Sequence, residues 1–134
     1  MGTYTERMIG EGEHGYWCSE DHNHMLTFAK YQLESRSTAI YPSMGCGLWY
    51  PVLGLTGEAG EVAEKVKKIF RDRGGVITQE DKEALGKELG DVLWYLAQIA
   101  TDLGISLEEV GQNNIEKLQS RKKRDVLQGD GDNR

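Results

Sequence analysis

The sequence predicts an all-α protein, and three observations support that class. No segment alternates apolar and polar residues with period two over a useful length, as a half-buried strand does. Long stretches instead repeat apolar residues at helical spacing, and the glycines at 74 and 104 stand where two of these stretches end. Valine and isoleucine, which favour strands, are scattered along the chain.

The first predicted helix covers about residues 22–35. Asp21 stands directly before it as a candidate N-cap, because a carboxylate can accept hydrogen bonds from the unpaired amides of a first turn. Helical spacing places Leu26, Ala29 and Leu33 on the face that is expected to point inward.

Three longer helices follow. The second is expected over about residues 52–72, with Gly74 ending it. Thr78 starts the third, which runs to about Leu103, and Ser106 starts the fourth, since a hydroxyl at either position can cap first-turn amides.

The chain divides by composition into three parts. Residues 1–20 are polar and contain glycine, and are predicted to form an irregular extension. Residues 21–124 form one helical domain, and residues 125–134 a flexible tail. Apolar residues make up 38% of the chain, below the usual globular value, which favours burial against a second copy of the chain.

Charge and cysteine content exclude several classes of function. The net charge of −6 excludes binding to the backbone of a nucleic-acid polymer, whereas a triphosphate can bind if metal ions bridge the negative partners. Two cysteines are too few for a disulfide scaffold. The chain has no signal-peptide pattern and no run of roughly 18 apolar residues. A cytoplasmic location without a membrane segment is therefore expected.

One acidic pattern occurs twice, in the second and third predicted helices. Residues 58–62 read Glu-Ala-Gly-Glu-Val, and residues 88–92 read Glu-Leu-Gly-Asp-Val. Both acid pairs have the same angular position at the margin of an apolar stripe, so packing of the two stripes brings four carboxylates together. Converging carboxylates repel each other unless a cation neutralises them, and oxygen ligands suit magnesium. The alternative is that these acids are ordinary solvated charges.

Three segments resemble the MazG-like all-α nucleoside triphosphate pyrophosphohydrolases. They read GEAGEVAEKVKK, KELGDVLWYLAQIATDLGISLEEV and NNIEKLQSRKKR, and the similarity covers about residues 52–124. The family's ExxE and ExxD motifs match Glu58-x-x-Glu61 and Glu88-x-x-Asp91. The preceding YQLESRSTAIYP is similar to the first helix of short, phage-type members.

The resemblance implies a fold, a reaction and a metal site. The fold is a four-helix bundle completed by homo-oligomerisation, as a dimer or a tetramer. The reaction cleaves a nucleoside triphosphate between its α and β phosphates, giving the monophosphate and pyrophosphate, in the host cytoplasm if the chain is phage-encoded. By this resemblance, Glu58, Glu61, Glu88 and Asp91 bind Mg²⁺, or Mn²⁺ in its place, and Glu61 is the catalytic residue that activates water.

The fourth helix supplies candidate substrate ligands. Asn114 falls within its apolar face, and Lys117 and Arg121 lie on one flank. The family's N-x-x-K pattern matches Asn114 and Lys117 and favours phosphate or sugar binding, with Arg121 as a further ligand. The alternative is a polar contact between helices beside two solvated charges. Lys65, on the second helix, is expected to pair with Glu58 or Glu61 or to contact phosphate.

Two further groups of residues, the candidate base-binding residues and a cysteine–histidine cluster, each have two interpretations. Candidate base-binding residues lie in or after the first helix, with packing as the alternative: Gln32, Arg36, Thr38, Tyr41 and Trp49. The similarity to phage-type members favours dGTP or GTP. A zinc site is a further alternative for His14, Cys18, His22 and His24, with Cys46 further along the chain. A non-catalytic helical module that binds a structural cation is the alternative function.

Overall fold

A computed structural model describes residues 7–9, 16–18, 25–45 and 47–128. It contains four helices, which confirms the all-α class. They are α1 (Phe28–Arg36), α2 (Trp49–Arg73), α3 (Gln79–Asp102) and α4 (Leu107–Lys123). None of the helices in the described ranges is both long enough and apolar enough to cross a membrane.

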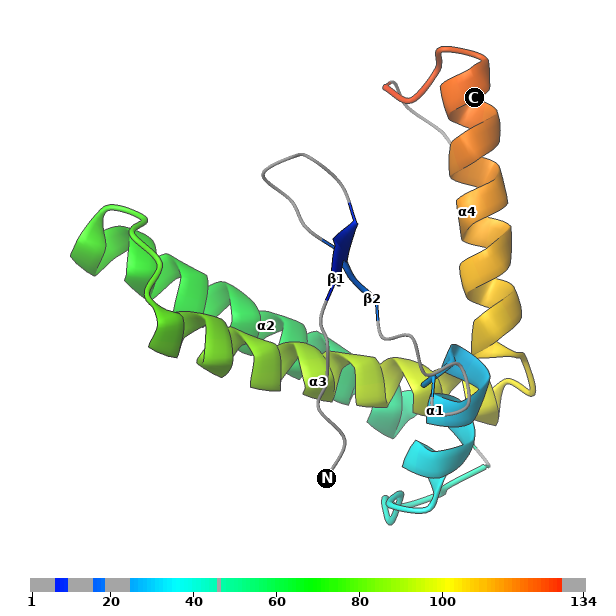
Figure 1. Ribbon diagram of the computed structural model, residues 1–134. Coiled ribbons are helices and arrows are strands. Elements are labelled where there is room, and N and C mark those ends of the chain that lie inside the picture. Colours follow the sequence, from blue (N-terminus) through cyan, green and yellow to red (C-terminus); the bar gives the residue numbers. More distant parts are fainter. Residues whose placement is uncertain (1–6, 10–15, 19–24, 46, 129–134) are drawn as a thin grey trace, which may run out of the picture.

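The two longest helices, α2 and α3, lie side by side as an antiparallel hairpin (Figure 1). Gly74 ends α2 with a left-handed φ of 60°, a conformation that glycine adopts without steric cost. Thr78 caps α3 as predicted: its hydroxyl accepts from the Asp81 amide at 3.3 Å, and the Asp81 carboxylate accepts from the Thr78 amide at 2.8 Å. Local sequence therefore sets the turn that brings the two helices together.

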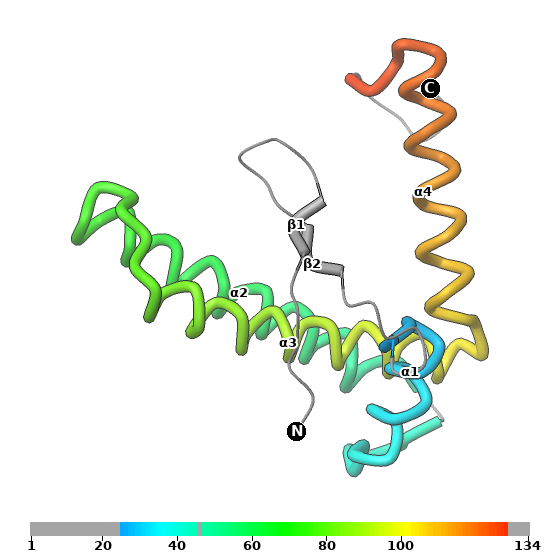
Figure 2. The backbone as a smooth tube through the Cα atoms, viewed as in Figure 1, coloured from blue at the N-terminus to red at the C-terminus, as the bar shows by residue number. Residues whose placement is uncertain are grey.

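Helix α4 leaves the hairpin at one end and extends away from it (Figures 1 and 2). It contacts α1 and the end of α3, and within the described residues it does not pack against α2. Ser106 caps it as predicted, accepting from the Glu109 amide at 3.3 Å. The four predicted helices are present, but a single chain does not close them into a bundle. Closure by oligomerisation stays a prediction.

Helix α1 differs from its prediction. It begins at Phe28 with Thr27 as the N-cap, six residues later than expected, and Asp21 lies outside the described residues. Leu26 and Leu33 are 60% and 77% exposed, so they do not point into the chain's interior. The prediction that Leu26 and Leu33 point inward was wrong because α1 packs on α3 through Tyr31 and through polar side chains instead.

A polar network joins α1 and the segment after it to α3. The Arg36 guanidinium donates to Asp102 at 2.8 Å, to Tyr41 at 2.7 Å and to the amide oxygen of Gln98 at 3.1 Å. The Tyr41 hydroxyl donates to the other Asp102 oxygen at 2.6 Å. Gln98 is fully buried and donates to Ser35 at 3.3 Å. Burial of these polar groups is tolerated because each has a partner.

Two short strands, β1 (Arg7–Ile9) and β2 (Tyr16–Cys18), pair antiparallel with Met8 opposite Trp17. Residues 1–20 were predicted to be irregular, which is wrong for these six residues. Three residues are too few to show an alternating pattern, so periodicity does not detect such strands. Of the predicted tail, residues 129–134 lie outside the described residues.

Candidate active site

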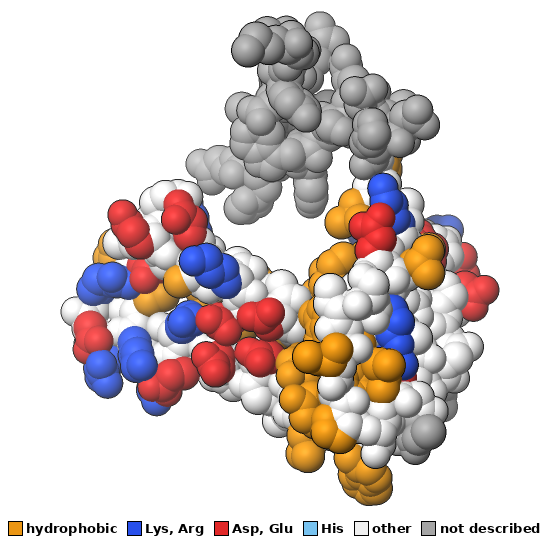
Figure 3. Space-filling model, turned by 90° about the horizontal axis from the view of Figure 1, so that it is seen from below, with side chains coloured by type: hydrophobic (Ala, Val, Ile, Leu, Met, Phe, Trp, Pro, Cys, Tyr) orange, Lys and Arg blue, Asp and Glu red, His pale blue; other side chains and the backbone are white. Residues whose placement is uncertain are grey.

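Three of the four predicted metal ligands converge between α2 and α3. One side-chain oxygen from each of Glu58, Glu88 and Asp91 lies within 4.8 Å of the others. Glu58 and Glu88 are half-buried and Asp91 is exposed. We call these three residues the acidic triad. Figure 3 shows acidic side chains gathered on this part of the hairpin.

Glu61 stands beside the triad but is not one of its three converging residues. It lies one helical turn from Glu58 on α2, and its side chain is exposed. Its charge still acts on the site, because it contributes to the raised pKa of Glu58. The four acids thus form a group of three and a neighbour rather than four equivalent ligands.

The electrostatics of the triad favour a bound cation. Burial raises the pKa of the Glu58 carboxyl, and the charges of Asp91, Glu61 and Glu88 raise it further. Like charges held together in this way disfavour ionisation, and a cation among them reverses the effect. Three carboxylates fit Mg²⁺, which takes few protein ligands and keeps positions for water and phosphate oxygens. The residues present therefore fit the metal that the sequence motifs imply.

Lys65 bridges the two helices. Its ammonium lies 3.3 Å from a carboxylate oxygen of Glu88, so it forms an ion pair, as expected, but with an acid of the opposite helix. Angular position on α2 alone pointed to Glu58 and Glu61. A lysine side chain is long enough to reach across the hairpin, which spacing within one helix does not capture.

The three predicted substrate ligands on α4 are not brought to the triad within one chain. Asn114 and Lys117 are exposed. Arg121 is 6% exposed, near the C-terminal end of α4. Because α4 extends away from the hairpin, these residues stand apart from the acids on α2 and α3 (Figure 1).

The predicted base-binding residues have mainly structural contacts. Arg36 and Tyr41 belong to the polar network described above. Gln32 donates to the Ile105 carbonyl at 2.9 Å and accepts from the Leu107 amide at 2.8 Å, which ties α1 to the start of α4. Thr38 accepts from the indole of Trp94 at 2.7 Å. These contacts favour packing, the alternative weighed for these side chains.

The remaining candidate, Trp49, is 84% exposed at the first position of α2. Trp94 packs edge-on against the rings of Tyr41 and Tyr95, with centroids 6.1 and 4.9 Å away. Trp94 thus contacts the segment after α1 as well as its own helix. Of the cysteine–histidine cluster, Cys18 is in β2, and the three histidines and Cys46 lie outside the described residues.

Aromatic side chains next to the triad are a feature that the sequence patterns did not reveal. Tyr95 lies one turn beyond Asp91 on α3, and burial, then the hydroxyl of Tyr50 and the charge of Glu58, raise its pKa. Its ring covers Gly54, where an added Cβ would lie 2.2 Å from the ring. The i, i+4 spacing from Asp91 to Tyr95 and from Gly54 to Glu58 was the available signal.

A second tyrosine approaches the acids from α1. The pKa of the Tyr31 hydroxyl is raised, first by burial and then by the charge of Asp91. Tyr31 also packs against the small core formed by Ala97, Ala100 and Leu107. The packing of α1 on α3 thus brings one aromatic side chain against the apolar core and near enough to Asp91 for that charge to act on its hydroxyl.

Comparison with known proteins identifies the family to which the chain belongs. The sequence profile of the MazG nucleotide pyrophosphohydrolase domain matches residues 51–126, more than half of the chain. The Gene 37 protein of Mycobacterium phage L5 is 58% identical over 109 residues, which are 78% of this chain and 96% of that protein. The chain therefore belongs to the MazG nucleotide pyrophosphohydrolase family, and its similarity to short phage proteins is confirmed.

Two proteins of Bacillus subtilis are more distant relatives. The uncharacterized protein YpjD is 38% identical over 69 residues, 52% of this chain and 61% of YpjD. The uncharacterized protein YvdC is 40% identical over 72 residues, 50% of this chain and 68% of YvdC. No solved structure matches the chain.

Proposed function

We propose that this protein is a metal-dependent (d)NTP pyrophosphohydrolase that cleaves between the α and β phosphates. The observation that carries the proposal is the convergence of Glu58, Glu88 and Asp91, contributed by two facing helices of a MazG-family chain. These three residues would hold a hard divalent cation, which would supply polarisation of the phosphoryl oxygens and of the attacking water.

The residues of the chain have distinct proposed roles. Glu58, Glu88 and Asp91 hold Mg²⁺, or Mn²⁺ in its place, while Glu61 acts as the general base that orients and deprotonates water. The exposed position of Glu61 beside the triad supports this division, because a base must reach water that the metal ligands surround. Glu61→Gln is then expected to retain metal binding and lose turnover.

A homo-oligomer, dimer or tetramer, completes the proposed site. Large apolar side chains of α1 and α4 are exposed on the single chain, among them Phe28, Leu33, Ile115 and Leu118, all at least 44%. Burial of these side chains against a second copy would stabilise the assembly. The α4 of a neighbouring copy can then supply Asn114, Lys117 and Arg121 to the triphosphate.

The base preference is proposed as guanine, with dGTP or GTP as substrate. The resemblance of YQLESRSTAIYP to the first helix of short, phage-type members is the ground for this choice. Tyr95 and Tyr50 provide the aromatic surface next to the triad, with ring centroids 6.5 Å apart, and aromatic rings can stack on a base.

The proposal is tested by incubating the protein with each (d)NTP and Mg²⁺ and resolving the products. Pyrophosphate and the nucleoside monophosphate are expected, with turnover abolished by a chelator. Release of orthophosphate would refute the cleavage position. Metal-dependent thermal stabilisation without turnover of any triphosphate would favour the alternative, a non-catalytic module that binds a structural cation.

A further inference from the structure

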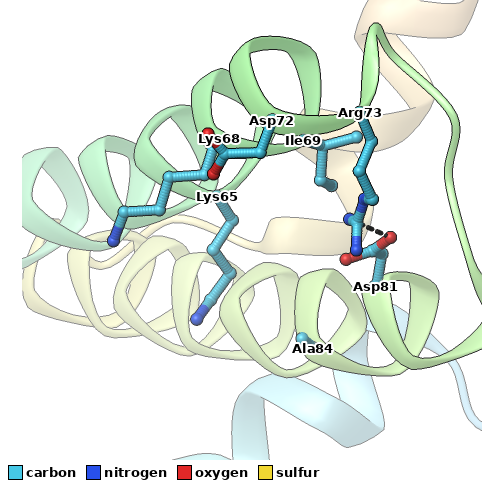
Figure 4. A pocket seen from close by; sticks show the side chains of 7 residues that line it. All are labelled: Lys65, Lys68, Ile69, Asp72, Arg73, Asp81 and Ala84. Carbon is cyan, nitrogen blue, oxygen red and sulfur yellow. Dashed lines mark hydrogen bonds and ion pairs between the residues drawn. The ribbon is translucent and has the colours of Figure 1, made fainter.

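Lys65 is the residue whose contacts the proposed function does not yet explain. Figure 4 shows it projecting from α2 toward α3. Its ammonium pairs there with Glu88 of the acidic triad at 3.3 Å. The Glu88 side chain is 15% exposed and that of Lys65 is 35% exposed, so both partners are partly shielded from solvent. The pair therefore engages one oxygen of a carboxylate that belongs to the proposed metal site.

A neighbouring lysine shows how specific this contact is. Lys65 and Lys68 both line a cavity of about 290 Å³ between α2 and α3. Lys68, however, pairs with Glu64 on its own helix at 3.3 Å. Arg73, also at this cavity, pairs with Asp81 near the start of α3. These two pairs leave the triad untouched, whereas the pair formed by Lys65 involves one of its members.

From this geometry we infer that Lys65 is an exchangeable counter-ion, which neutralises Glu88 in the metal-free protein and must release it when a divalent cation binds the triad. The inference rests on the proposed metal site. A cation and an ammonium compete for one carboxylate, since the two positive charges repel each other at this distance. Lys65 thus lowers the affinity for the metal while stabilising the metal-free fold.

The cavity beside Lys65 gives the displaced ammonium a place to move. The side chain already lines that cavity, and a lysine changes rotamer at little cost when it is partly exposed. In the alternative role, Lys65 would hold Glu88 in position for the metal, and its removal would then weaken metal binding. The sign of the change in affinity therefore separates the two roles.

The test is calorimetric titration of metal-free full-length protein with MgCl₂ or MnCl₂, without nucleotide. Lys65→Met is expected to bind the metal roughly fivefold more tightly than wild type, the scale of a partly exposed ion pair. Lys65→Arg retains the charge and should stay within about twofold of wild type. The matched control Lys68→Met removes a lysine from the same cavity and should leave the affinity unchanged.

Thermal unfolding provides a second readout. Lys65→Met should melt at a lower temperature than wild type without metal, and the difference should narrow at saturating metal, because the cation then neutralises the triad. Unchanged or weaker metal binding by Lys65→Met overturns the inference. If the wild type binds metal and hydrolyses triphosphates in that case, only the inference fails. If the wild type binds no metal, the proposed function fails as well.

Discussion

Helix α3 carries two groups of acidic and polar side chains that differ in how their charges are balanced. At Asp102, the guanidinium of Arg36 and the hydroxyl of Tyr41 each lie within 2.8 Å of a carboxylate oxygen. Three to four turns earlier, Glu88 and Asp91 face Glu58, and these like charges help to raise the pKa of Glu58. The first group is satisfied by the chain itself, whereas the second is balanced only in part, by Lys65 at Glu88, and has spare capacity for a cation.

The difference teaches how a structural polar cluster is distinguished from a binding site. Arg36 and Tyr41 were candidate ligands by residue type, but their donors and acceptors already serve the packing of α1 and the following segment on α3. The triad has the opposite property, since its members repel each other in the absence of a ligand. Substitutions in the two groups should therefore differ in their effects.

The largest expected effect is on turnover. Asp91→Asn should lower kcat for the preferred triphosphate roughly 100-fold or more, because it removes the charge of a proposed metal ligand. Glu64→Gln is the matched control, since Glu64 lies on α2 but pairs with Lys67 and Lys68. Steady-state assays of pyrophosphate release measure both. Equal activity of Asp91→Asn and the control would contradict the assignment of the triad.

The network at Asp102 should respond through stability. Asp102→Asn should lower the free energy of unfolding by about 3 kcal/mol, because the side chain is 1% exposed and its loss leaves the charge of Arg36 without its partner. Urea denaturation measures the change. Saturating Mg²⁺ should not restore the loss, whereas a full restoration would place Asp102 in the metal site.

Two glycines of α2 sharpen the comparison near the triad. Gly54→Ala should destabilise the fold by about 1–3 kcal/mol, since the new Cβ overlaps the ring of Tyr95. Gly57→Ala meets no atom within 4 Å and should stabilise α2 by about 0.5–1 kcal/mol. Thermal denaturation of the two variants measures whether each substitution lowers or raises the stability. A stabilised Gly54→Ala variant would show that the Tyr95 ring does not occupy this position.

The smallest expected effect is on the pH dependence of stability without metal. The folded-state pKa of Glu58 lies above its ordinary value of 4.5, so the folded state binds the proton more strongly than the unfolded state. The contribution of Glu58 to stability is therefore present below pH 4.5 and is lost as pH rises through the raised pKa. Glu58→Gln should flatten this part of the stability profile. An unchanged slope would show that Glu58 is not the responsible group.

Features determined by neighbouring residues could be predicted from the sequence. Spacing within one helix or turn determines the caps Thr78 and Ser106 and the end of α2 at Gly74. It also determines that Glu58 on α2 and Glu88 on α3 each lie at the margin of their helix's apolar stripe. The convergence of the triad followed because the turn between α2 and α3 is short, which makes the two helices antiparallel neighbours.

Features that depend on distant partners could not be predicted. Arg36 and Asp102 are 66 residues apart, and no local pattern indicates that α1 would bury a polar face. The inward positions Leu26 and Leu33 were wrong for this reason. The position of α4 relative to the hairpin is likewise set by packing at its first turn, where Gln32 binds the Leu107 amide.

The central claim, that Glu58, Glu88 and Asp91 together hold a divalent cation, is tested most directly by electron paramagnetic resonance of Mn²⁺. The metal-free protein is titrated with Mn²⁺ without nucleotide, and the signal of the free ion reports how much is bound. Saturable binding is expected for the wild type, together with a loss of at least about tenfold in affinity for Asp91→Asn and little change for Glu64→Gln. Equal Mn²⁺ binding by all three proteins would contradict the claim.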